Sequence, residues 1–298
     1  MKFALHTRVA ASSSTNALAL SPDGSLVAVT TFDQKCRLYR TDTMALLKSL
    51  HLGTAFPHAL CFSPDGRAVA SGGKALTLFD TTTWKKGVSL KGHRHELQDA
   101  AFSPDGSRVY TGSGNNYTPA DWSLRAWDAA TGDPLWKWKA ATPVFAVAVS
   151  PDRKTVAAGD RNGTLTLLDA ETGLARGAVA TGGWIYHAAF VPDGSAVVAS
   201  GDAHHLSVVS TADASLRTIP MPSGARAFAL TPDGTTALVG GTAYGLPVEL
   251  LALDLASGEV QGRGPTVGRL PQGVACSPDG LRLYVLVNDP HELLVFDL

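Results

Sequence analysis

Short apolar runs separated by turn-forming residues recur from one end of the sequence to the other. The first run of each unit comes directly before a tetrapeptide of the SPDG type and a second run follows it, as ALAL and LVAVTT do around the first copy. A third run often ends in an apolar residue and Asp, as in LFD and AWD, and a fourth follows a turn marked by Thr-Gly or Ser-Gly. Runs this short, bounded by Gly, Pro and Asp, predict strands rather than helices. Each unit therefore predicts four strands.

The tetrapeptide occurs seven times, at intervals of 40 to 47 residues. The copies begin at Ser21, Ser63, Ser103, Ser150, Val191, Thr231 and Ser277. Pro presets φ at the first corner, Asp hydrogen-bonds its own backbone and Gly accepts a positive φ, so each copy predicts a tight turn between two strands. Repeats of this length with four strands are typical of β-propeller blades. Seven copies therefore predict seven blades.

The two termini of the protein complement each other. Only two strand-like runs follow the last SPDG, whereas Lys2 to Arg8 form an extra run before the first copy. We predict that residues 1–8 supply the outer strand of the last blade and close the ring, which leaves no open sheet edge. The expected fold is an all-β, seven-bladed propeller of four-stranded antiparallel blades, with residues 1–298 in a single domain.

Composition narrows the classes of partner. The sequence has 25 Lys and Arg against 26 Asp and Glu, a formal charge of −1, so we expect neither nucleic acid nor an anionic membrane as a partner. No apolar stretch reaches the length of a signal peptide or a membrane span. Cys36, Cys61 and Cys276 form no CxxC pair, which argues against a disulfide framework and a thiolate metal site. We expect a soluble, cytoplasmic monomer without a cofactor.

These features resemble the WD-repeat β-propellers. The third repeat carries the best match, with Gly92-His93 before its first strand, SPDG at Ser103 and LRAWD ending at Trp127-Asp128. In that family a His, a Ser or Thr, an Asp and the Trp form a hydrogen-bonded network within the blade. The resemblance implies a structural network of His93, Thr111, Asp121 and Trp127. The other repeats keep fewer of these residues, which leaves the propellers with YVTN-type repeats, some of which are enzymes, as the nearest alternative.

Two repeats are longer than the others. The third and the sixth gain residues between their second and third strands, at 115–120 (NNYTPA) and 242–247 (TAYGLP). Each added loop carries a tyrosine, Tyr117 or Tyr244. In a propeller this connection lies on the rim opposite the first turn of the blade. Both loops are therefore expected opposite the Pro-Asp-Gly turns.

Alignment of the repeats on the tetrapeptide reveals a second feature of that rim. Five positions before each copy, where the axial channel is expected to open, every residue is large and polar or aromatic: Asn16, His58, Gln98, Phe145, Tyr186, Arg226 and Gln272. Seven positions before it lie Phe56, Glu96 and Trp184, among others. Aromatic residues and Arg are typical of binding hot spots, although Phe56, Phe145 and Trp184 could instead pack between blades. We predict a partner-binding rim that comprises Phe56, His58, Tyr117, Phe145, Trp184, Tyr186, Arg226 and Tyr244.

Motifs of known chemistries are absent from the sequence. It contains no GxSxG, HExxH or P-loop motif in a suitable element. The pair His93/His95 is assigned to structure because His93 fits the blade network, and the pair His204/His205 because adjacent strand residues face opposite sides. We expect no metal site. The leading hypothesis is a non-catalytic scaffold that binds a protein or peptide. The alternative is a hydrolase or lyase similar to the propeller lactonases, with His58, Glu96, Tyr186 and Arg226 as an acid/base and anion-binding set at the channel mouth.

Overall fold

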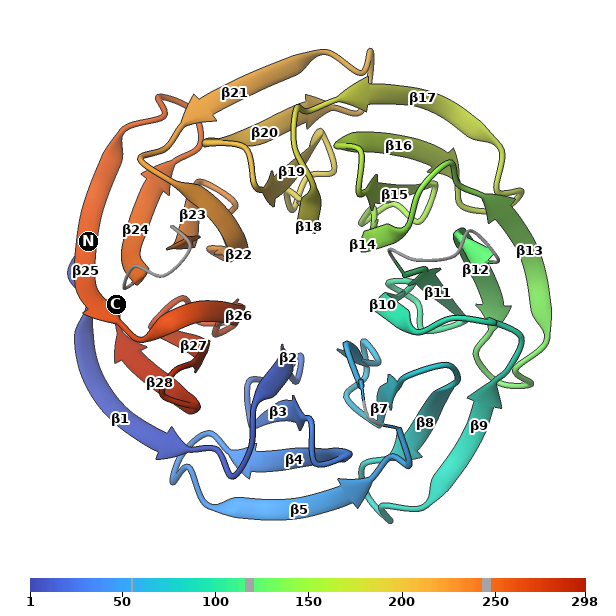
Figure 1. Cartoon of the computed structure of the whole chain (residues 1–298), viewed down its shortest axis with the longest axis horizontal. Helices are drawn as coiled ribbons and strands as arrows, with labels where there is room; N and C mark the ends of the chain where they lie inside the picture. The colour runs from blue at the N-terminus through green and yellow to red at the C-terminus, as the bar shows by residue number, and fades with distance from the viewer. Residues whose placement is uncertain (55, 116–120, 243–247) are drawn as a thin grey trace.

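The strands of this protein form seven sheets arranged as a ring (Figure 1). The computed structural model describes residues 1–298 except 55, 116–120 and 243–247. Each sheet has four antiparallel strands, and six sheets follow sequence order, as in β2-β3-β4-β5, from the axis outward. The predicted seven-bladed propeller is thus confirmed. Within the described part of the protein, no helix is long and apolar enough to cross a membrane.

The strands of the first three blades and the closing strand are bounded as follows: β1 (Ala4–Ala10), β2 (Thr15–Leu20), β3 (Leu26–Thr31), β4 (Lys35–Arg40), β5 (Leu46–His51), β6 (Ala59–Phe62), β7 (Ala68–Gly72), β8 (Leu76–Asp80), β9 (Lys86–Leu90), β10 (Leu97–Phe102), β11 (Arg108–Ser113), β12 (Ser123–Asp128) and β13 (Pro134–Lys139). The remaining four blades comprise β14 (Val144–Val149), β15 (Thr155–Asp160), β16 (Thr164–Asp169), β17 (Ala175–Ala180), β18 (Ile185–Phe190), β19 (Ala196–Gly201), β20 (His205–Ser210), β21 (Leu216–Pro220), β22 (Gly224–Leu230), β23 (Thr236–Thr242), β24 (Val248–Asp254), β25 (Val260–Val267), β26 (Arg269–Cys276), β27 (Arg282–Asn288) and β28 (Glu292–Asp297).

The N-terminal strand closes the ring. β1 pairs antiparallel with β28, from Ala4 opposite Asp297 to Ala10 opposite Glu292. It is the outermost strand of the seventh blade, as predicted, although the strand begins and ends two residues later than the predicted Lys2 to Arg8. The cores of the first and last blades also merge, since Val27 of β3 belongs to one buried cluster with Tyr284 of β27. Side-chain packing therefore closes the ring together with the backbone hydrogen bonds.

In six of the seven tetrapeptides the hydroxyl of the first residue donates to the Asp two residues later, and only the copy that begins at Val191 lacks this hydroxyl. In the first copy the Ser21 hydroxyl donates to Asp23 Oδ1 (2.6 Å), and the backbone N–H of Gly24 donates to the Ser21 carbonyl (2.8 Å). The bond from Ser21 is the main reason why the pKa of Asp23 lies below its usual value. Gly24 has a φ of 70°, a conformation that glycine adopts at little cost. These hydrogen bonds, which the sequence predicted, thus form within the four residues of the turn.

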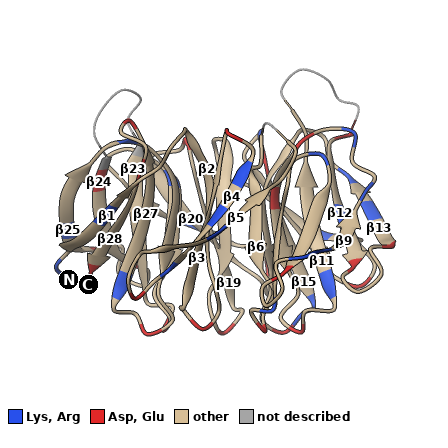
Figure 2. Cartoon of the chain, turned by 90° about the horizontal axis from the view of Figure 1, so that it is seen from below, with Lys and Arg blue, Asp and Glu red and all other residues tan. Residues whose placement is uncertain are grey.

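The turns of neighbouring blades lie side by side on one rim. A Cβ atom added at Gly24 would lie 2.9 Å from Pro278 in the turn of the seventh blade, and one added at Gly66 would lie 3.7 Å from Pro22. We name this side the turn rim. The innermost strand of every blade runs toward it and therefore starts at the opposite side, which we name the mouth rim (Figure 2).

Candidate functional site

An extra residue near the start of the innermost strands points a side chain toward the axis of the ring. In β2, Thr15 pairs with Thr31 and Ala17 with Thr30, so Asn16 is left over as a β-bulge. A bulge re-aims the side chain of the extra residue and is common beside functional sites. The same register shift leaves over Gln98, Phe145, Tyr186, Arg226 and Gln272, while His58 directly precedes β6. These seven residues, named the mouth ring, are the members of the column five positions before the tetrapeptide.

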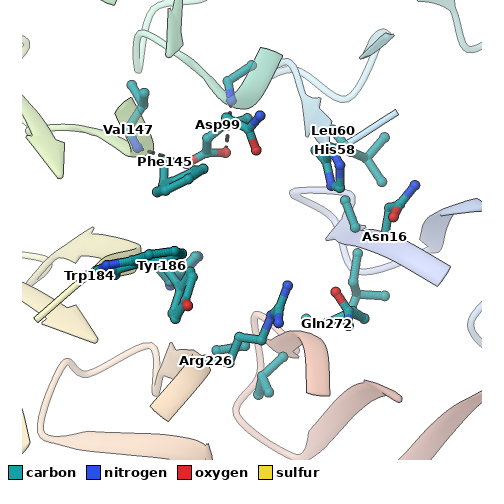
Figure 3. A pocket seen from close by; sticks show the side chains of 18 residues that line it. Asn16, His58, Leu60, Asp99, Phe145, Val147, Trp184, Tyr186, Arg226 and Gln272 are labelled. Atoms are coloured by element: carbon teal, nitrogen blue, oxygen red, sulfur yellow. Dashed lines mark hydrogen bonds between the residues drawn. The ribbon is translucent and has the colours of Figure 1, made fainter. Parts of the chain in front are cut away.

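The mouth ring surrounds an axial cavity of about 470 Å³. All seven of its members line the cavity, together with Trp184 and, from the inner-strand walls, Asp99 and His187 (Figure 3). A volume of this size lies in the range of sites that hold small molecules or inserted side chains. The sequence-predicted residues His58, Phe145, Trp184, Tyr186 and Arg226 are therefore brought together. Glu96, which the enzymatic alternative placed with them, is not among the residues that line the cavity.

Three aromatic side chains form one side of the cavity. The rings of Phe145 and Trp184 are stacked, with their centroids 6.0 Å apart. The centroid of the Tyr186 ring lies 6.3 Å from that of Phe145 and 6.1 Å from that of Trp184. Two guanidinium groups lie against this aromatic cluster, Arg161 at 4.4 Å from the Trp184 ring and Arg226 at 5.2 Å from the Tyr186 ring. Aromatic faces attract cations, so these contacts orient both arginines. The three rings thus pack between the fourth and fifth blades, and their role in binding a partner stays a prediction.

The opposite side of the cavity is polar. Gln272, Asn16, His58 and Gln98 succeed one another around the ring in the seventh, first, second and third blades. Asn16 is only 7% exposed, and its amide nitrogen has no hydrogen-bond partner among the described residues. Burial, with a smaller contribution from the Arg226 charge, lowers the pKa of His58 to about 4. His58 is therefore neutral at pH 7 and can both donate and accept a hydrogen bond.

Two titratable residues of the cavity wall were missed in the sequence. Asp99 accepts hydrogen bonds from the backbone N–H groups of Ala100 (2.8 Å) and of Val147 in the next blade (2.8 Å), and burial raises its pKa to about 7. Burial lowers the pKa of His187 to about 4, and its ring lies edge-on to Phe228 at 4.9 Å. A signal was present: the position four before the tetrapeptide is Ala or Gly in the other five repeats.

An exposed aromatic pair lies next to the cavity. Phe56 is 48% exposed, contacts Phe32 edge-on (5.6 Å) and stacks beside His58 (6.4 Å). Phe32, itself 38% exposed, comes from the connection between β3 and β4 and was not anticipated. Together Phe32 and Phe56, the outer aromatic pair, extend the mouth rim beyond the cavity. Tyr117 and Tyr244, the loop tyrosines expected on this rim, lie outside the described residues.

The four residues that the family resemblance linked in the third blade are connected by hydrogen bonds. His93 Nδ1 lies 3.0 Å from Asp121 Oδ2, His93 Nε2 lies 2.8 Å from Thr111 Oγ1, and the Trp127 indole N–H donates to the same hydroxyl (2.8 Å). All four side chains are buried. Burial alone would raise the pKa of Asp121, but hydrogen bonds from His93 and the Lys137 ammonium outweigh it and lower that pKa. The polar groups of this network are thus satisfied within the blade, which fits a structural role.

Two of the other histidines singled out in the sequence, His95 and His205, have structural partners. His95 lies 3.0 Å from the side-chain nitrogen of Asn115, and His205 Nε2 lies 2.9 Å from the carbonyl of Thr181. Among the described residues, no three His, Cys, Asp or Glu side chains come together in a way that could hold a metal ion. The chemistry of the site therefore rests on the aromatic cluster, the mouth-ring amides, Arg226 and the neutral His58.

Two family models match this protein. The model described as "WD domain, G-beta repeat" matches residues 4–40 and 84–128, and the model described as "Outer membrane protein assembly factor BamB" matches residues 120–280, just over half of the sequence. The first of the WD-domain segments contains β1 to β4, and the second ends at the Trp127-Asp128 pair of the third blade. The WD-domain matches thus include the repeat that carries the resemblance.

Curated relatives are similar over part of their length. The serine-threonine kinase receptor-associated protein of Gallus gallus is 25% identical over 44% of this protein and 35% of its own length. The WD repeat-containing protein SL1-17 of Schistosoma mansoni is 25% identical over 52% of this protein and 50% of its own length. The meiotic recombination protein rec14 of Schizosaccharomyces pombe is 27% identical over 39% and 37%. The matched region thus spans half the length or less of these relatives.

Proposed function

Because this protein belongs to the WD-repeat β-propellers and, over residues 120–280, to the family described as outer membrane protein assembly factor BamB, we propose that it is a non-catalytic scaffold that binds a protein or peptide on its mouth rim. WD-repeat relatives favour an interaction role in general. One of them, the receptor-associated protein of Gallus gallus, is named for an association with another protein. The choice of rim is our own inference and rests on the site.

The observation that supports the mouth rim is the composition of the mouth ring. The seven equivalent positions carry six residue types, including Phe145, Tyr186 and Arg226, whereas the turn rim repeats one tetrapeptide with small variations. Trp184 and the outer aromatic pair add apolar surface beside them. Aromatic residues and Arg dominate the binding energy of protein interfaces when they become desolvated. The mouth rim is therefore the surface on which a partner would gain most.

A second candidate function has one observation in its favour. The pKa of Asp99, raised to about 7 inside the cavity, would suit a general acid or base in a hydrolase or lyase. Both carboxylate oxygens, however, accept backbone hydrogen bonds, one of them across the blade boundary from Val147. This geometry fits a clamp between the third and fourth blades better than a group that exchanges protons with a substrate.

The test is capture of the native partner by mouth-rim variants. Removal of a desolvated anchor commonly costs ~2 kcal/mol or more in binding. Trp184→Ala combined with Arg226→Ala should therefore abolish capture in a pull-down read by mass spectrometry, while the folded circular-dichroism spectrum persists. The matched controls Asp65→Ser and Asp193→Ser change the turn rim and should retain the partner. Capture lost in the controls and kept in the double variant would place the binding surface on the turn rim instead.

A further inference from the structure

Resting on the proposed scaffold role, we infer that the axial cavity receives a carboxylate of the bound partner, either an acidic side chain or a free C-terminus, against Arg226. The guanidinium of Arg226 projects into the cavity (Figure 3). Within the described residues it has no ion pair and no hydrogen bond, only the contact with the Tyr186 ring. Other arginines of the protein are held by carboxylates, such as Arg37 by Asp33 and Arg125 by Asp121 at 2.9 Å.

The position of Arg226 prepares it for an anion. It is the bulged residue of β22, so its side chain leaves the blade and enters the cavity. Its contact with Tyr186 restrains the plane of the guanidinium at 5.2 Å from the ring and leaves the N–H edges available. A planar guanidinium with free N–H edges matches the two oxygens of a carboxylate and binds them in a bidentate manner.

The acidic side chain that lines the cavity already accepts hydrogen bonds from the backbone. Among the described residues, Asp99 is the one acidic side chain that lines the cavity, and its oxygens accept hydrogen bonds from the N–H groups of Ala100 and Val147. His58, His187 and the amides of the ring contribute no negative charge. The amide of Asn16, whose nitrogen lacks a partner among the described residues, can turn about its broad χ2 torsion to become a second donor. The cavity thus offers one cation and surplus donors to an incoming anion.

The surroundings of the cavity favour a peptide as the source of that carboxylate. The outer aromatic pair, Phe32 and Phe56, lies next to His58 but does not line the cavity, and both residues are more than a third exposed. A small molecule within the cavity would leave them uncovered. A peptide that inserts its acidic group toward Arg226 could lay neighbouring apolar residues on the outer pair and on Trp184, which would remove apolar surface from water.

The experiment is a selection of random peptides on the purified protein, from one library with free C-termini and one with the C-terminus blocked. Selected peptides are expected to share Asp, Glu or a free C-terminus at one fixed position, with apolar neighbours. Affinity of the best peptide should fall on the order of ten- to a hundredfold with Arg226→Gln, and equally when its carboxylate is replaced by an amide. The two changes together should cost no more than either alone. The control Arg67→Gln removes an exposed arginine of the turn rim and should have no effect.

The outcomes separate this inference from the proposed function. If peptides bind in a Trp184-dependent manner but tolerate the loss of their carboxylate or of Arg226, the carboxylate inference is overturned and the scaffold role stands. If no selected peptide depends on Trp184, Phe56 or Arg226, the proposed function fails as well. Titration of 3-phenylpropionate and its amide, followed by tryptophan fluorescence, covers the other source. Binding of the free acid alone, dependent on Arg226 and without any selected peptide, would identify a small carboxylate as the occupant and overturn the partner assignment.

Discussion

The turn rim and the mouth rim are built from the same repeat, but they differ in whether their polar side chains have hydrogen-bond partners within the protein. On the turn rim, Ser21 and Asp23 bond to each other within one turn, as Ser63 and Asp65 do in the next blade. In the mouth ring, equivalent positions carry different side chains, and Arg226 and the Asn16 nitrogen have no hydrogen-bond partner among the described residues. Where hydrogen bonds form within one turn, every repeat can carry the same residues. Where polar side chains have no such partner, they are available to bind a ligand.

The pKa values express the same contrast. Hydrogen bonds within the turns lower the pKa of Asp23 and of Asp65, so these exposed acids are stabilised in their charged form. In the cavity wall burial acts in the other direction, since it raises the pKa of Asp99 and lowers those of His58 and His187. Both shifts favour neutral forms. At pH 7 both histidines of the cavity wall are therefore neutral, and Asp99 is partly protonated.

The largest loss of stability is expected when the ring is opened, because both rims require a closed ring. Deletion of residues 1–10 removes β1 and exposes the edge of β28. We expect aggregation, or a decrease in the melting temperature of at least ~10 °C, as measured by differential scanning calorimetry. His6→Ala, a change in the same strand that removes only an exposed contact with Asp297, serves as the control. An unchanged melting temperature after the deletion would contradict closure by β1.

A smaller loss of stability should distinguish the hydrogen-bonded network of the third blade from the aromatic cluster of the mouth rim. Trp127→Phe removes the indole donor to Thr111 and should lower the free energy of unfolding by about 1–3 kcal/mol. Trp184→Phe, the same change in the aromatic cluster, should alter it by less than about 0.5 kcal/mol. His93→Ala should cost less in the Trp127→Phe background than alone, because both residues bond to one hydroxyl. Equal losses at the two tryptophans, measured by urea unfolding, would remove the contrast between the regions.

The smallest effect is a pH dependence that arises in the cavity wall. The folded-state pKa of Asp99, about 7, lies above its ordinary value of 3.8, so its contribution to stability is full below that ordinary value and is lost as the pH rises through 7. His58 and His187 act in the opposite direction, but at lower pH, where stability is lost as the pH falls from 6.5 toward 4. Between pH 6.5 and 8 the contribution of Asp99 to stability should fall by about 1 kcal/mol, while the two histidines offset this loss, because their unfolded forms still lose protons in the lower part of this range.

Asp99→Asn isolates this contribution. The variant lacks this acid but keeps both histidines, so its melting temperature should rise with pH between 6.5 and 8 by a few degrees relative to that of the parent protein, whatever the lost backbone hydrogen bond costs at every pH. The comparison is made on the slope with pH and not on the absolute value. Asp65→Asn on the turn rim is the matched control and should keep the slope of the parent protein. A parent protein and an Asp99→Asn variant with equal slopes would show that Asp99 does not titrate in this range.

Some of the site could be predicted because a repeat converts sequence position into spatial position. The column five before the tetrapeptide identified the cavity-lining residues, including Phe145, Tyr186 and Arg226, before any bulge was known. Asp99 and His187 lie one position after this column in their repeats. They were not predicted, because strand alternation suggests that such residues point away from the channel. The bulge changes that alternation and leaves both residues in the cavity wall. Glu96 was predicted from the column seven positions before the tetrapeptide, and the structure leaves it outside the cavity lining, although its charge acts on His58.

The sequence by itself determined the seven blades, the turn rim and the closing strand. Those features depend on φ preferences and hydrogen bonds within a few residues, and on one repeat length, all of which can be read locally. Only the tertiary structure decided that Asp99 and His187 join the mouth ring in the cavity wall, how far burial moves their pKa values, and that Arg226 meets no carboxylate among the described residues. Burial and the presence or absence of a partner are set by residues from other blades, between forty and more than two hundred positions away in the sequence.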